Sequence, residues 1–185
     1  MAVLVEAISV VIRLETLAEK YPGGVDQYAE DCHNGTFCMD KDIARVGFMS
    51  PEDVDVFIDN LELLGLTCVT NGEYEEIAVL AQFRGLILPC EWLEVLEVKI
   101  FEGNQKIMVC QIKDTDFSGV FCPRGWNYET SLSKKVVMVK SEDTDKRMKF
   151  LRHEDGVDFY LDKHTGQEVF IEQSIKRTAN KHLLH

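Results

Sequence analysis

Residues 3–12 read VLVEAISVVI, an almost unbroken run of apolar side chains near the start of the chain. β-Branched residues such as Val5, Ile8 and Val10 recur through this run, and such residues are enriched in strands. An apolar run without polar alternation is typical of a strand that is buried on both faces. The run therefore predicts a buried β-strand over residues 3–12, against which the following helices can pack.

Helical spacing follows this strand. Apolar residues recur every three or four positions from Leu14 and again from Val25, and Pro22-Gly23-Gly24 separates the two runs. A second strand is expected over 43–49. The clearest boundary in the chain is Ser50-Pro51-Glu52-Asp53, which supplies an N-cap hydroxyl, a proline for the first turn and two acids. It predicts a helix that ends at Gly65.

The first half ends in a predicted hairpin. Asn71-Gly72 accepts the positive φ angles of a tight turn, so residues 67–70 and 74–83 are expected to pair around it. Residues 1–90 then predict a two-layer α/β arrangement in the order β-α-β-α-β-β.

The second half has a different sequence pattern, with short predicted strands and few helical stretches. A hairpin is expected over 92–101 and 105–113, and turn residues separate further short strands at 134–140, 147–152, 157–161 and 168–172. This pattern predicts an antiparallel β-rich meander or a small barrel, with a helical tail over 175–184. The fold class is therefore α+β. We expect an acidic α/β domain over 1–90 and a β-rich domain over 91–185, or alternatively one continuous domain.

The 185 residues have a formal net charge of −12, and the acidity lies in the first half. Residues 1–90 contain 5 Lys and Arg against 16 Asp and Glu, whereas residues 91–185 contain 15 against 16. An acidic surface repels nucleic-acid phosphates and anionic lipids, so binding to either is not expected. It would attract a basic protein, although solubility alone also explains such a charge.

Targeting and redox signals favour the cytoplasm. The apolar start of the chain lacks a basic flank and contains Glu6, which fits neither a signal peptide nor a membrane span. Six dispersed cysteines are then expected to be reduced thiols, several of them buried.

No catalytic motif is present. The sequence lacks a nucleophile elbow, a phosphate-binding glycine loop and a zinc-protease motif, so an enzyme is not favoured. Cys32, His33 and Cys38 are the ligand types of zinc, but their spacing departs from a zinc knuckle and no second pair follows. We expect neither a metal nor another cofactor.

The stretch 114–131 is the best candidate for a binding site. It reads DTDFSGVFCPRGWNYETS, and long irregular segments in compact domains are often functional. Aromatic residues and arginine dominate interface hot spots. The alternative is that the aromatics fold back over the sheet. The candidate residues are Phe117, Phe121, Arg124, Trp126 and Tyr128.

An acidic stripe on the helix after Ser50 is a second candidate. Glu52, Asp55, Asp59 and Glu62 recur at helical spacing, and no Lys or Arg lies on that helix. The stripe fits either a solvated face or a surface for a basic partner.

Three hypotheses for the function follow. The first is a non-enzymatic protein-binding module for a basic partner. In composition the chain is similar to small acidic bacterial proteins such as the immunity proteins that neutralise toxins, a similarity that transfers no residues. The second is a small-molecule sensor or enzyme with a pocket between the halves, with Cys32, His33 and Cys38 or Arg124 at its wall. The third is a structural protein that forms homodimers or larger homo-oligomers.

Overall fold

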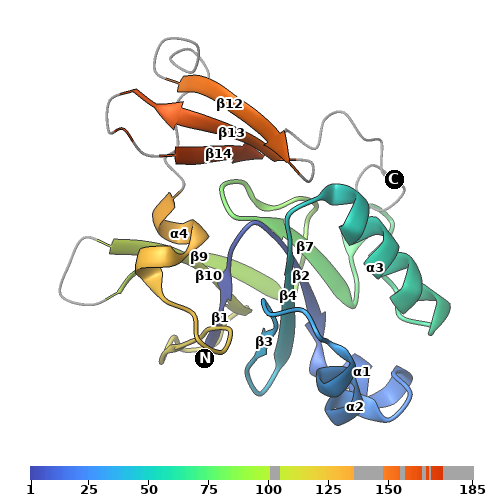
Figure 1. Ribbon diagram of the computed structural model, residues 1–185. Helices are drawn as coiled ribbons and strands as arrows, with labels where there is room; N and C mark the ends of the chain where they lie inside the picture. Colours follow the sequence, from blue (N-terminus) through green and yellow to red (C-terminus); the bar gives the residue numbers. More distant parts are fainter. Residues whose placement is uncertain (101–104, 136–147, 155–156, 164–165, 167, 173–185) are drawn as a thin grey trace.

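The computed structural model describes residues 1–100, 105–135, 148–154, 157–163, 166 and 168–172 (Figure 1). They form a mixed α+β fold, as the sequence predicts. The described strands belong to a five-stranded sheet, a four-stranded sheet, a three-stranded sheet and a two-stranded hairpin. None of these described sheets closes into a barrel, so the meander is the better of the two predictions for the second half.

The apolar run at residues 3–12 is two strands, not one. β1 (Ala2–Val5) and β2 (Ile8–Arg13) belong to different sheets. Ala7 between them has a φ angle of 51°, in the left-handed region, and turns the chain from one sheet into the other. The prediction of a single strand was wrong because apolar side chains continue on both sides of this bend, so the pattern carries no sign of it.

β2 lies in the middle of the five-stranded sheet, which we call the central sheet. Its strand order is β3-β4-β2-β7-β8, and β2 pairs antiparallel with both of its neighbours. The other strands are β3 (Cys38–Met39), β4 (Ile43–Phe48), β7 (Ile77–Ala81) and β8 (Gly85–Leu86). The helices α1 (Leu14–Lys20) and α2 (Gly24–Asp31) follow β2 at the predicted positions.

The helix predicted after Ser50 is confirmed. α3 spans Pro51–Leu63, and the Ser50 Oγ accepts a hydrogen bond from the backbone N–H of Asp53 at 3.2 Å. The left-handed stop at Gly65 is also present, with a φ angle of 91°. The N-cap and the stop together fix the length of α3.

The hairpin at Asn71-Gly72 forms but is short. β5 (Val69–Thr70) and β6 (Glu73–Tyr74) pair around it, and both turn residues have positive φ angles. The predicted second arm, 74–83, divides after Tyr74, and its remainder is β7. β7 pairs with β2 because its five buried apolar residues complete the central sheet.

The four-stranded sheet, which we call the second sheet, joins the two halves of the chain. Its order is β11-β1-β10-β9, with β9 (Leu93–Ile100), β10 (Gln105–Ile112) and β11 (Val120–Phe121). β9 and β10 form the predicted hairpin. β1 lies between β10 and β11, so backbone hydrogen bonds join residues 1–90 to residues 91–185. The division into domains remains a prediction, and this pairing supports the alternative of one continuous domain.

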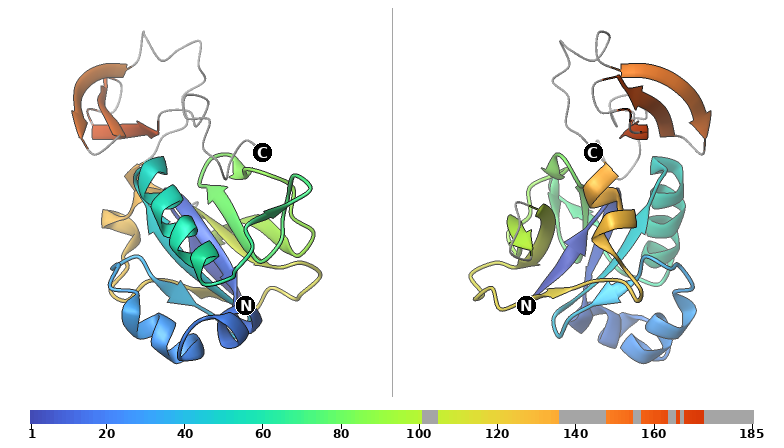
Figure 2. Two further views of the ribbon diagram at one scale, coloured as in Figure 1. Left: turned by 90° about the vertical axis from the view of Figure 1, so that its right-hand side faces the viewer. Right: turned by 60° about the vertical axis from the view of Figure 1, so that its left-hand side comes forward.

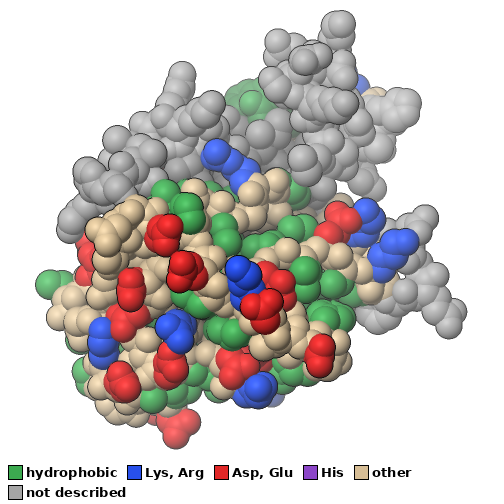
Figure 3. All heavy atoms as spheres, turned by 180° about the vertical axis from the view of Figure 1, so that it is seen from behind, with side chains coloured by type: hydrophobic (Ala, Val, Ile, Leu, Met, Phe, Trp, Pro, Cys, Tyr) green, Lys and Arg blue, Asp and Glu red, His purple; other side chains and the backbone are tan. Residues whose placement is uncertain are grey.

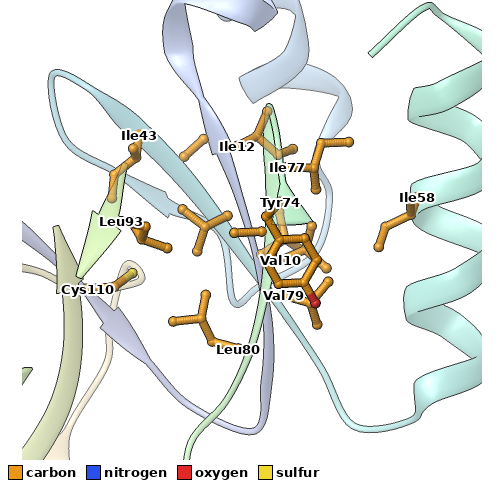
Figure 4. Close-up of a cluster of buried hydrophobic side chains, with 14 of the residues drawn as sticks. Val10, Ile12, Ile43, Ile58, Tyr74, Ile77, Val79, Leu80, Leu93 and Cys110 are labelled. Atoms are coloured by element: carbon orange, nitrogen blue, oxygen red, sulfur yellow. The ribbon is translucent and has the colours of Figure 1, made fainter. Parts of the chain in front are cut away.

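The core is built in layers. Ile58 of α3 faces Val10, Ile77 and Val79 on one face of the central sheet, whereas Leu80 lies on the side of Leu93 and Cys110 from the second sheet (Figure 4). Figure 2 shows α3 on one side of β2, and β9 and β10 on the other. The order is therefore α3, central sheet, second sheet.

The remaining part of the chain contains a short helix and a separate sheet. α4 spans Leu132–Lys135 after the 3-10 turn Tyr128–Thr130, so the strand predicted over 134–140 is wrong at its start, where the backbone is helical, and 136–140 lie outside the described residues. β12 (Met148–Glu154), β13 (Val157–Asp162) and β14 (Glu168–Glu172) form the predicted antiparallel meander. The predicted tail helix also lies outside the described residues.

A buried arginine holds the bend between β1 and β2. Arg45 on β4 is 1% exposed, and its Nη2 donates to the backbone O of Glu6 at 2.5 Å. Its Nε donates to the Ser9 Oγ at 2.8 Å, and that hydroxyl donates to the same Glu6 carbonyl at 3.0 Å. The backbone of Ala7 is paired with Gln82, which accepts from its N–H and donates to its O. The polar groups of the bend are thus satisfied inside the fold, where an unpaired one costs about 1–3 kcal/mol.

The guanidinium of Arg45 needs a glycine beside it. A Cβ atom at Gly47 would lie 2.6 Å from the Nη2 and 2.9 Å from the Cζ of Arg45. We expect Gly47→Ala to displace the guanidinium and to lower the free energy of unfolding by about 2–3 kcal/mol in urea titrations.

Gly35→Ala is the matched control for this substitution, because no atom lies within 4 Å of a Cβ at Gly35. We expect it to change the free energy of unfolding by less than about 0.5 kcal/mol. Equal effects of the two substitutions would show that Arg45 does not hold the bend.

Candidate functional site

The two largest aromatics of the segment 114–131 fold back onto the second sheet. Trp126 and Tyr128 are half-buried against the face of the sheet that contains Leu4 and Val109. Their rings meet edge to face, with centroids 6.4 Å apart. These two candidates therefore cover the sheet, which is the alternative that the sequence leaves open for them.

Phe117, Phe121 and Arg124 are exposed. Phe117 is 47% and Phe121 is 41% exposed, although both belong to a residue type that is usually buried. Arg124, which follows Phe121 closely in the sequence, is also exposed. The segment thus divides into a part that packs and a part that is accessible to a partner.

The outward face of α3 carries acidic and apolar residues side by side. Glu52, Val56, Asp59 and Leu63 follow one another at spacings of four, three and four, which places them on one side of the helix. All four are exposed, Val56 to 62% and Leu63 to 84%. Asp55 and Glu62 flank this side and are half-buried. We call Glu52, Val56, Asp59 and Leu63 the α3 face.

The two predicted binding elements do not form one surface. α3 packs on the outer side of the central sheet, and Trp126 and Tyr128 pack on the outer side of the second sheet (Figures 1 and 2). They pack on different sheets, although Phe48, whose ring centroid lies 5.0 Å from that of Phe57 on α3, lines one cavity with Arg124 and Trp126. Figure 3 shows acidic side chains spread across the side of the molecule opposite to Figure 1, with lysine and arginine side chains among them. Charge alone therefore does not mark the binding surface.

A cavity of about 230 Å³ lies between the two halves of the sequence. Glu6, Thr36 and Arg45 line it from the first half, and Arg124, Trp126 and Leu132 from the second. The structure thus contains a cavity of the kind that the second hypothesis requires, with Arg124 at its wall as that hypothesis expects.

Arg45 is the cavity residue that the sequence reasoning missed. Within the strand IARVGF it stands among apolar residues, and Gly47 follows on the same face. A charged side chain inside an otherwise apolar strand, followed two positions later by a glycine, was the available signal. The apolar residues of this strand indicate only that it is buried.

The three candidate metal ligands, Cys32, His33 and Cys38, do not form a metal site in the described structure. Cys32 lines a smaller cavity of about 180 Å³ between α2 and α3, and His33 is exposed with its Nδ1 2.8 Å from the backbone O of Asp31. Cys38 is buried on β3, and its burial raises the pKa of its thiol against the opposing effect of Arg45. Among the described residues no group of three or more His, Cys, Asp or Glu side chains could hold a metal ion.

Comparison with known proteins found no matching family model, no similar curated protein and no similar solved structure. Within the described part of the chain, no helix combines the length and the apolar character needed to cross a membrane.

The buried thiol of Cys68 and the half-buried thiol of Cys122 predict a loss of stability at alkaline pH. Burial raises the pKa of Cys68 to about 12 and that of Cys122 to about 11. The Cys68 Sγ also donates to the backbone O of Ile77 at 3.9 Å, a contact that needs the neutral thiol. An unfolded cysteine ionises near pH 8.5, so the folded state holds these protons more tightly. These raised pKa values stabilise the folded state. Their contribution to the free energy of unfolding is complete below about pH 8.5 and is lost as the pH rises towards 11 and 12.

We expect the midpoint temperature of unfolding, measured under reducing conditions, to fall between about pH 9 and pH 11. Cys122→Ala should make this fall smaller, whatever its effect at neutral pH. An unchanged pH dependence in this variant would contradict the raised pKa of Cys122.

Proposed function

We propose that the protein is a non-enzymatic protein-binding module that recognises a basic partner through the α3 face. The observation that carries the proposal is the exposure of Val56 and Leu63, at 62% and 84%, on the same side of the helix as the carboxylates of Glu52 and Asp59. Large aliphatic side chains at the centre of an interface gain affinity by excluding water, and charged groups beside them set the choice of partner.

The fold supports α3 as a binding element. Val54, Ile58 and Leu61 anchor the opposite side of the helix in the core, and the Ser50 cap fixes its first turn. A rigid helix presents its outward side chains with little loss of conformational entropy on binding. The complementary surface would carry Lys or Arg opposite Glu52 and Asp59 and an apolar groove for Val56 and Leu63.

The charge of the chain supports a basic protein as the partner. The acidic first half raises the association rate of a basic protein by roughly 10 to 1,000-fold at low salt, and it disfavours nucleic acid. A homodimer formed through the α3 face would bring two acidic surfaces together, so the α3 face is poorly suited to self-association. All six cysteines are free, which supports a reducing compartment such as the cytoplasm.

Native mass spectrometry of the protein, gently purified from its host under reducing conditions, should find a stoichiometric basic protein bound to it. With that partner identified, Glu52→Lys/Asp59→Lys should weaken the affinity by at least about tenfold, measured by biolayer interferometry. Leu63→Ser should have a similar effect without a change of charge.

Glu19→Lys/Glu30→Lys is the matched control, because it changes the net charge equally at exposed positions of α1 and α2. We expect it to alter the affinity by less than about threefold. Equal losses from the two double variants would assign the effect to overall charge and reject the α3 face, and a preparation without any bound protein would reject the proposed function.

A further inference from the structure

The cavity between the halves contains a cation whose hydrogen-bonding capacity is not filled. Arg45 has five N–H groups, and three of them bond to the Ser9 Oγ, the Thr36 O and the Glu6 O. One N–H on the Nη1 and one on the Nη2 have no oxygen acceptor among the described residues, and the thiol of Cys38, a weak acceptor, also makes a side-chain hydrogen bond with this guanidinium. Arg45 also forms no ion pair with a described carboxylate, although it is 1% exposed.

The structural role of Arg45 does not require these two N–H groups. The bend between β1 and β2 is held by the bonds to Ser9 and Glu6, and the third bond holds the turn before β3. Burying a cation is costly, and the single carboxylate of Glu6 compensates only one of the two guanidinium charges in the cavity wall, so an anion in the cavity would offset the remaining cost.

Two further residues of the cavity wall, Trp126 and Arg124, carry hydrogen-bond donors. The indole Nε1–H of Trp126 is buried and has no acceptor among the described residues. Arg124 contributes a second, exposed guanidinium. These donors come from the second half of the chain and Arg45 comes from the first, so the site needs both.

The carboxylate in the cavity wall, that of Glu6, already accepts hydrogen bonds from Ser133. Glu6 also lines the wall, but its Oε1 accepts hydrogen bonds from the backbone N–H of Ser133 at 2.9 Å and from its Oγ at 2.5 Å. Two guanidinium groups and one carboxylate leave the cavity with one formal positive charge, inside a protein whose net charge is −12. A single negative charge would balance it.

The size and the walls restrict the ligand further. The wall also contains the apolar side chains of Phe48, Met49, Pro123 and Leu132, which favour an apolar body. Its volume of about 230 Å³ lies below the roughly 300–1,000 Å³ of drug-sized sites. We propose that this cavity binds a small monocarboxylate with a compact apolar body, its carboxylate held by Arg45, Arg124 and the Trp126 Nε1–H.

Isothermal titration calorimetry with acetate, hexanoate and benzoate tests this site on the intact chain. We expect saturable binding of benzoate with a Kd of about 1 mM or lower. Benzamide, which has the same shape without the charge, should bind at least about tenfold more weakly. Arg124→Gln should weaken benzoate binding by about tenfold, and Trp126→Phe, which keeps a ring and removes the N–H, by about threefold.

Arg84→Gln is the matched control, because Arg84 is exposed and lies outside the cavity wall. It should leave the Kd unchanged within about twofold. The proposal is overturned if none of the three carboxylates binds below about 20 mM, or if benzamide binds as well as benzoate. It is also overturned if inorganic phosphate binds more tightly than all three, or if Arg84→Gln and Arg124→Gln have equal effects.

Discussion

The guanidinium of Arg45 on the carbonyl of Glu6 is the contact on which the arrangement of the two sheets depends. The chain must leave the second sheet after β1 and enter the central sheet at β2, and it does so within two residues. Such a bend inside the core exposes backbone groups to an apolar environment. Arg45, Ser9 and Gln82 satisfy them, and Gly47 leaves room for the arginine.

The position of this bend decides what lies on the outside. Because the two sheets face each other, each has one outer side, and the chain covers them differently. α3 covers the central sheet and presents its acidic and apolar residues outwards, whereas Trp126 and Tyr128 close over the second sheet. The cavity forms beside the bend, where the segment containing Arg124 approaches β4. The α3 face and the cavity wall share no residue, so each can be tested without the other.

Local sequence signals predicted local structure well. Ser50-Pro51 marked the start of α3, Asn71-Gly72 marked a tight turn, and the β9–β10 hairpin was placed within one residue at its inner ends. These elements are set by caps, turns and periodicity within a few residues. The division of the first strand at Ala7 was not predictable in this way, because the partners that stabilise it are distant in sequence. Gln82 and Arg45 act there through the folded structure.

The candidate site was predictable in part for the same reason. Helical spacing gave the acidic side of α3, and the composition of 114–131 gave its aromatics, but not which of them pack against the sheet. Arg45 looked like one residue of a buried strand. Its importance arises from long-range contacts with Glu6 and Ser9 and from its place in the cavity wall, which residue types and spacing do not reveal.

Native-state amide hydrogen exchange, followed by NMR, tests the central claim that this bend joins the two sheets into one unit. Opening free energies should be equal for the slowest amides of β10 in the second sheet and of β7 in the central sheet, because both would open in the same global unfolding event. A β10 that exchanges through an opening of clearly lower free energy than β7 would show that the second sheet unfolds alone, and would contradict the role given to Arg45.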